Sequence, residues 1–107
     1  MRIPQVYNID MTKRANKYRL ALEQLESAGE EKGLHGPLQL EFDNHDELFG
    51  IIDRVKQKNP FGDPDHSTQF AIGLKMFSEV LLKNRSNPLF EEFAPAFREF
   101  MKKLKQS

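Results

Sequence analysis

Two short segments of the chain alternate between apolar and polar residues, and they match each other in one antiparallel register. A period of two is typical of strands that bury one face. With Leu20 opposite Leu40, apolar residues pair on one face and opposite charges on the other: Tyr18 with Phe42, Leu22 with Leu38, Arg19 with Glu41, and Lys17 with Asp43. Because both faces agree on this register, we predict an antiparallel two-stranded hairpin.

A helix is the alternative for the first of these segments. Ala15, Tyr18 and Leu22 also fit a spacing of three and four residues, and alanine, leucine, glutamate and glutamine favour helices. The second segment favours the strand, because it offers a partner in a matching register after a loop at residues 27–37 that contains three glycines.

The first predicted helix starts where the second strand ends. Asn44 is a favoured N-cap residue, and Glu47 three positions later completes a pair that resembles a capping box. Apolar residues then recur at helical spacing, and a stretch with two prolines and a glycine ends the helix near Asn59.

The second predicted helix is the longest. Asp65 or Ser67 caps it, and it runs to about Lys83. Because most of its circumference is apolar, we expect it to be the central and most buried helix. Its main stripe consists of Phe70, Leu74, Phe77 and Leu81.

The last helical region contains a proline. Asn87 and Pro88 supply a cap and a first-turn proline. Pro95 then interrupts the pattern, so we expect this helix to be kinked or broken near Pro95, at about Ala94. The predicted fold class is therefore α+β, with an antiparallel two-stranded hairpin followed by three helices.

The length and composition fit one globular domain. The chain has 107 residues, of which 38% are hydrophobic and 30% charged, close to ordinary globular usage. We expect an N-terminal extension at residues 1–16 and a single α+β domain at residues 17–107. No apolar run reaches the roughly 20 residues of a membrane span or the about 7–15 of a secretory signal, so we expect a cytoplasmic protein without membrane contact.

Four stretches carry a resemblance to a known family: KYRL at residues 17–20, LEFDNHDELF at 40–49, FAIGLKMF at 70–77 and NPLF at 87–90. In these the chain resembles a family of small bacterial proteins called domain of unknown function 3861. The similarity covers most of residues 17–105. It implies an α+β domain in which a hairpin precedes helices, and it brings no activity, ligand or catalytic residue.

Asn44, His45 and Asp46 are the cluster in the sequence that most resembles a binding or catalytic site. An imidazole beside a carboxylate at a strand-to-helix junction suits ligand binding or acid–base work. The structural interpretation is capping of the following helix, with His45 in an exposed first turn. This cluster is the binding site in our alternative hypothesis, a small-molecule binder or enzyme.

Other chemistries lack support in the sequence. The chain has no cysteine, which removes thiolate nucleophiles and cysteine-ligated metals. Its three histidines lie apart and without the spacing of known zinc motifs. We therefore predict no catalytic residue, no metal site and no cofactor. The 16 basic and 16 acidic residues balance, so we also expect no nucleic-acid partner.

A row of phenylalanines repeats at three and four residues in the last helical region, and we call it the Phe stripe: Phe90, Phe93, Phe97 and Phe100. A stripe at this spacing is most often core, but any part left uncovered would form a partner surface. Our leading hypothesis is a non-catalytic interaction or accessory domain. Its expected partner is an unidentified protein or a second copy, joined through the Phe stripe or a free strand edge.

Overall fold

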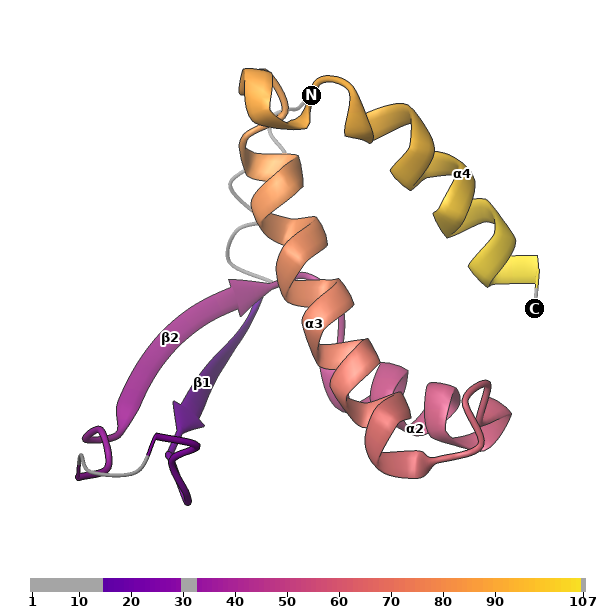
Figure 1. Ribbon diagram of the computed structural model, residues 1–107. Coiled ribbons are helices and arrows are strands. Elements are labelled where there is room, and N and C mark those ends of the chain that lie inside the picture. Colours follow the sequence, from indigo (N-terminus) through magenta and orange to yellow (C-terminus); the bar gives the residue numbers. More distant parts are fainter. Residues whose placement is uncertain (1–14, 30–32, 107) are drawn as a thin grey trace. The chain divides into compact units, whose positions relative to one another are not determined.

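A computed structural model describes residues 15–29 and 33–106 of the protein (Figure 1). The predicted extension at residues 1–16 lies outside these ranges except for its last two residues. The elements follow in the order β1 (Asn16–Leu22), β2 (Leu38–Asn44), α2 (Leu48–Lys58), α3 (Pro64–Lys83), a 3₁₀ helix (Pro88–Phe90) and α4 (Phe93–Gln106). This order confirms the predicted α+β class, with a hairpin followed by three helices. By their contacts the residues fall into two compact units, the first ending at Ile51 and the second starting at Ile52.

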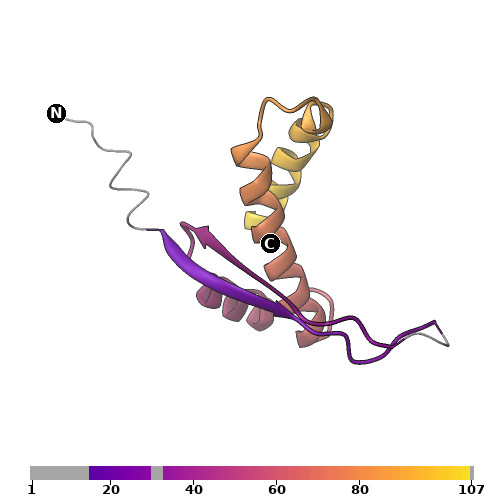
Figure 2. The same ribbon diagram turned by 90° about the vertical axis from the view of Figure 1, so that its left-hand side faces the viewer.

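The hairpin has the predicted register. Strands β1 and β2 run side by side in opposite directions (Figures 1 and 2), and Leu20 faces Leu40. On the polar face, Arg19 Nη2 lies 2.6 Å from Glu41 Oε2 and Lys17 Nζ lies 3.5 Å from Asp43 Oδ1. On the apolar face, the Tyr18 and Phe42 rings stack with centroids 5.6 Å apart. Both predicted sets of cross-strand pairs are therefore present.

Helix α2 begins later than the sequence predicts. Asn44 is still paired with Asn16 in the sheet, and its Oδ1 accepts a hydrogen bond from the Asp46 N–H at 2.9 Å. The helix starts at Leu48, where the Glu47 carboxylate accepts from the N–H groups of Phe49 and Gly50 at 3.1 and 2.9 Å. The prediction of Asn44 as N-cap is wrong because its side chain closes a turn, which leaves Glu47 to cap the helix.

The Tyr18 hydroxyl ties the hairpin to the start of α2. It donates to the Asp46 carbonyl at 3.2 Å and accepts from the Leu48 N–H at 3.0 Å. The Asn16 amide also donates to the Asp46 carbonyl at 3.2 Å. Because Leu48 is buried and its N–H lies in the first helical turn, Tyr18 satisfies a donor that has no partner within the helix.

Helix α3 also starts at a different residue from the one predicted. Asp63, rather than Asp65 or Ser67, is the N-cap, and its Oδ1 accepts from the Asp65 N–H at 2.9 Å. Pro64 occupies the first helical position, where its fixed φ suits the helix and its missing N–H costs no bond. The end at Lys83 is as predicted.

Small residues are the most buried part of α3. Among the described residues, only six are buried, and four of them lie on this helix: Ser67, Ala71, Ser78 and Leu81. The prediction of α3 as the most buried helix is confirmed. Its predicted stripe is only partly right, since Phe77 keeps 40% of its surface exposed.

The predicted break near Pro95 is present, and it lies before Ala94. A 3₁₀ helix ends at Phe90, residues 91–92 form a turn, and α4 begins at Phe93. Pro95 is thus the third residue of α4. A backbone N–H in this first turn has no hydrogen-bond partner within the helix, so the missing N–H of proline costs no bond. The proline is accommodated inside the helix because the break precedes it.

No helix in the part of the chain that the structure describes is long and apolar enough to cross a membrane.

Tyr18→Phe should lower the free energy of unfolding by about 1–2 kcal/mol, because the buried Leu48 N–H loses its partner while both ring contacts remain. Urea denaturation followed by circular dichroism measures this loss. The control Glu41→Gln removes an exposed ion pair and should cost at most about 1 kcal/mol. A loss for Tyr18→Phe no larger than that of the control would contradict the role given to the hydroxyl.

Gly73→Ala should raise the free energy of unfolding by about 0.5–1 kcal/mol, because Gly73 is exposed in the middle of α3 and a methyl group there meets no atom within 4 Å. Ala71→Leu, two residues away at a buried position, should cost about 1–3 kcal/mol. Thermal denaturation of both variants tests the pair, and equal effects would show that the buried face of α3 is misassigned.

Candidate functional site

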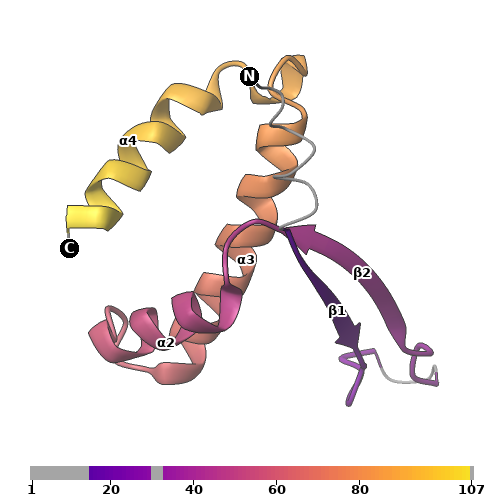
Figure 3. The ribbon, with the colours of Figure 1, turned by 180° about the vertical axis from the view of Figure 1, so that it is seen from behind.

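A cluster of aromatic rings holds α4 and the 3₁₀ helix against α3. Phe77 on α3 makes edge contacts with three rings, at centroid distances of 6.0, 6.0 and 5.7 Å: Phe90, Phe93 and Phe97. Closer to the start of α3, Phe70 meets Phe100 at 6.3 Å. Figures 1 and 3 show α4 running back in the opposite sense to α3. The Phe stripe therefore positions α4 on α3.

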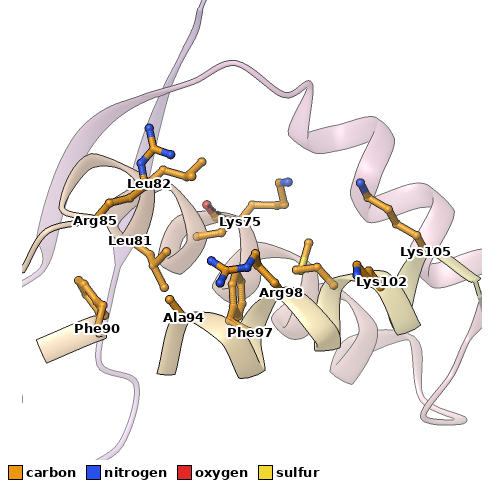
Figure 4. A pocket seen from close by; sticks show the side chains of 12 residues that line it. Lys75, Leu81, Leu82, Arg85, Phe90, Ala94, Phe97, Arg98, Lys102 and Lys105 are labelled. Atoms are coloured by element: carbon orange, nitrogen blue, oxygen red, sulfur yellow. Dashed lines mark hydrogen bonds between the residues drawn. The ribbon is translucent and has the colours of Figure 1, made fainter. Parts of the chain in front are cut away.

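A groove of about 550 Å³ lies beside this cluster, between α3 and α4 (Figure 4). We call it the α3–α4 groove. Its volume is within the range of roughly 300–1,000 Å³ that is common for ligand sites. It is lined by Lys75, Ser78, Leu81, Leu82, Arg85, Phe90, Ala94, Phe97, Arg98, Met101, Lys102 and Lys105.

The floor of the α3–α4 groove is apolar. Leu81 is buried, and Phe97 and Met101 of α4 are half-buried. The one polar side chain at this depth is Ser78, whose hydroxyl donates to the Lys75 carbonyl at 3.3 Å within its own helix. The floor thus favours apolar groups over polar ones.

Five cationic side chains surround this floor, and no carboxylate is among the lining residues: Lys75, Arg85, Arg98, Lys102 and Lys105. Figure 4 shows Arg85 at one end, Lys105 toward the other, and Arg98 between them. Lys102 also lies 3.6 Å from Glu99, an exposed pair that water screens strongly. The groove as a whole therefore suits an apolar group that carries negative charges beside it.

The structure divides the Phe stripe between two environments. Phe90 and Phe97 are half-buried and line the α3–α4 groove, whereas Phe93 and Phe100 lie outside the lining and remain 45% and 42% exposed. Leu82 of the groove is 57% exposed. The stripe is neither wholly core nor wholly surface, because its rings contact α3 with one side and leave the other uncovered.

Asn44, His45 and Asp46 lie together at the junction of β2 and α2, where Asn44 and Asp46 make hydrogen bonds that hold the turn and the start of the helix. The Asn44 side chain is buried and accepts from the Asp46 backbone, and the Asp46 carbonyl receives the Tyr18 hydroxyl. His45 is exposed. None of the three lines the α3–α4 groove. The alternative hypothesis of a small-molecule site here stays a prediction that rests on the sequence.

No group of three or more histidine, aspartate or glutamate side chains that could hold a metal ion is present in residues 15–29 and 33–106.

Three of the cations in the α3–α4 groove were not singled out by the sequence: Lys75, Arg85 and Arg98. They come from α3, from the segment after it and from α4, and only the return of α4 along α3 brings them together. Lys102 and Lys105 were interpreted as charges that complement the end of the last helix. A helical plot of α4 would have placed Arg98, Lys102 and Lys105 on one flank of the Phe stripe, since they are spaced by four and three residues.

Comparisons with known proteins agree with this architecture. A family described as a domain of unknown function with a solved structure, DUF3861, matches residues 16–106. A crystal structure of a protein of unknown function from Pectobacterium atrosepticum is similar, with 34% sequence identity and a TM-score of 0.74. The similarity covers 87% of this chain and 99% of that one. No curated protein matches the chain.

The fold and the groove define a small α+β domain in which a two-stranded hairpin precedes a helical unit with a basic, apolar groove. The chain belongs to the DUF3861 family. The family resemblance stated from the sequence is therefore confirmed.

Arg98→Gln should stabilise the protein at low salt by a few tenths of a kcal/mol, because it removes one of five cations that repel one another around the groove. The gain should vanish near 1 M salt, where the screening length falls to about 3 Å. Thermal melting at the two salt concentrations measures both effects. Lys17→Gln, which breaks a cross-strand ion pair, should not stabilise at either concentration. A stabilisation of Arg98→Gln that is independent of salt would contradict the electrostatic description of the groove.

Proposed function

We propose that this protein is a non-catalytic interaction domain that holds a protein partner in the α3–α4 groove. The observation that carries the proposal is the combination of an apolar floor with five surrounding cations. An apolar floor supplies affinity through burial, and charges at the edge supply orientation and selection against wrong partners.

The exposed residues beside the groove support the proposal. Leu82 and Leu89 keep 57% and 77% of their surface exposed, and Phe93 adds a half-exposed ring. Interface cores are enriched in aromatic residues, methionine and arginine, and the groove contains all three kinds. Uncovered apolar side chains close to one another usually mark a contact surface.

The proposed setting is the cytoplasm, with residues 17–107 acting as a single domain. A chain of 107 residues with no cysteine is suited to a reducing compartment, where disulfides contribute little to stability.

A photo-crosslinking amino acid at Leu82 tests this function in the native host. We expect a discrete protein adduct from this position, because Leu82 is exposed at the groove. The same amino acid at Gln57, which is exposed on α2 and does not line the groove, is the control and should give no adduct of that size. Mass spectrometry identifies the captured chain, whether foreign or a second copy.

The double variant Arg98→Glu with Lys105→Glu should abolish the adduct at Leu82 while far-ultraviolet circular dichroism stays unchanged. An absent adduct at Leu82, or equal adducts at Leu82 and Gln57, would overturn the proposed function.

A further inference from the structure

The α3–α4 groove selects a particular kind of occupant by its chemistry. Its floor favours apolar groups, and its five cations lie along the length of the groove rather than at one point (Figure 4). A fitting occupant therefore presents apolar side chains with carboxylates on neighbouring positions of one segment.

One segment of this same chain has that chemistry. It begins at the last residue of β1 and contains Leu22, Glu23, Leu25 and Glu26, all of them exposed, with Leu22 and Leu25 at 65% and 78%. We call residues 22–26 the acidic tip. Residues 23–31 hold four glutamates and no basic residue. Within the part of the chain that the structure describes, neither Glu23 nor Glu26 forms an ion pair.

The acidic tip has a defined shape. Leu22 is still paired with Leu38 in the sheet, and the Gln24 Oε1 accepts from the His35 N–H at 2.7 Å across the two arms of the hairpin. A segment anchored at both of these points loses less conformational freedom on docking than a free chain would. Both leucines and both glutamates of the acidic tip are exposed.

The balance of charge favours association between copies. The formal net charge is zero and the isoelectric point is about 6.8, so whole molecules do not repel one another near neutral pH. At the same time the charges are segregated into a basic groove and an acidic tip, which attract when they belong to different copies.

We propose that two copies of this chain form a closed dimer, in which the acidic tip of each copy docks into the α3–α4 groove of the other. This inference rests on the proposed function and names the partner as a second copy. The contact is made twice in a two-fold dimer, so both grooves and both tips are used and no site is left to extend a filament.

Sedimentation velocity over a concentration series tests the dimer with the full chain. The wild type should pass from monomer to dimer between micromolar and submillimolar concentrations. Glu23→Lys with Glu26→Lys (the tip variant) should weaken the dimer at least tenfold, because like charges then meet in the groove. Arg98→Glu with Lys105→Glu (the groove variant) should weaken it equally.

Mixing the two variants gives the sharpest outcome. In an equimolar mixture, the lysines of the tip variant meet the two glutamates that replace Arg98 and Lys105 in its partner, and the unchanged glutamates of the groove variant meet an unchanged basic groove. The mixture should therefore form a dimer at concentrations where each variant alone is a monomer.

A matched control for the groove variant carries the same change in charge elsewhere on the surface. Arg54→Glu with Lys56→Glu on α2, whose residues do not line the groove, should leave the dimer within twofold of the wild type. All variants change exposed residues, and circular dichroism verifies that they fold.

A wild type that stays monomeric throughout the series, or a mixture that does not recover the dimer, overturns the inference. If the chain is monomeric while Leu82 still crosslinks a different protein, the dimer is wrong and the proposed function stands. If no protein of any kind crosslinks at Leu82, the proposed function fails as well.

Discussion

Phe77 is the side chain on which the helical unit depends. It contacts rings from the 3₁₀ helix and from the first two turns of α4, and each such aromatic pair contributes about 0.5–1.5 kcal/mol beyond the burial of its area. These contacts fix the direction in which α4 returns along α3. The groove lies beside these rings, and Phe90 and Phe97 line it together with Leu81, Leu82 and the basic residues.

The hairpin could be predicted from the sequence because two independent patterns determine its register. Leu20 opposite Leu40 satisfies the apolar face, and Arg19 opposite Glu41 satisfies the charged face, so a slip by one residue would break both. Helix starts were predicted less well. Asn44 and Glu47 are both competent caps, and the choice between them depends on how far the β-sheet pairing extends, which the local sequence does not encode.

The buried face of α3 shows that apolar periodicity does not identify all buried residues of a helix. Apolar patterning identified Phe70 and Phe77, which are half-buried and 40% exposed, whereas Ser67 and Ala71 are the most buried residues of the helix. Small residues allow backbones and neighbouring side chains to approach closely, but they add little to an apolar stripe. The groove could not be predicted from the sequence either. Its cations come from α3, from the segment that follows α3 and from α4, and they meet only when the Phe stripe packs on α3. A net charge of zero conceals such segregation, because composition sums charges that the fold separates.

The central claim is that an apolar groove with a basic edge binds the acidic tip of a second copy. The most direct test is a dilution series of amide chemical shifts by nuclear magnetic resonance. The account predicts concentration-dependent shifts confined to two sets of residues, the groove around Arg98 and Met101 and the tip around Leu25. Shifts that do not change with concentration, or that change on the hairpin face of Arg19 and Glu41 instead, would contradict it.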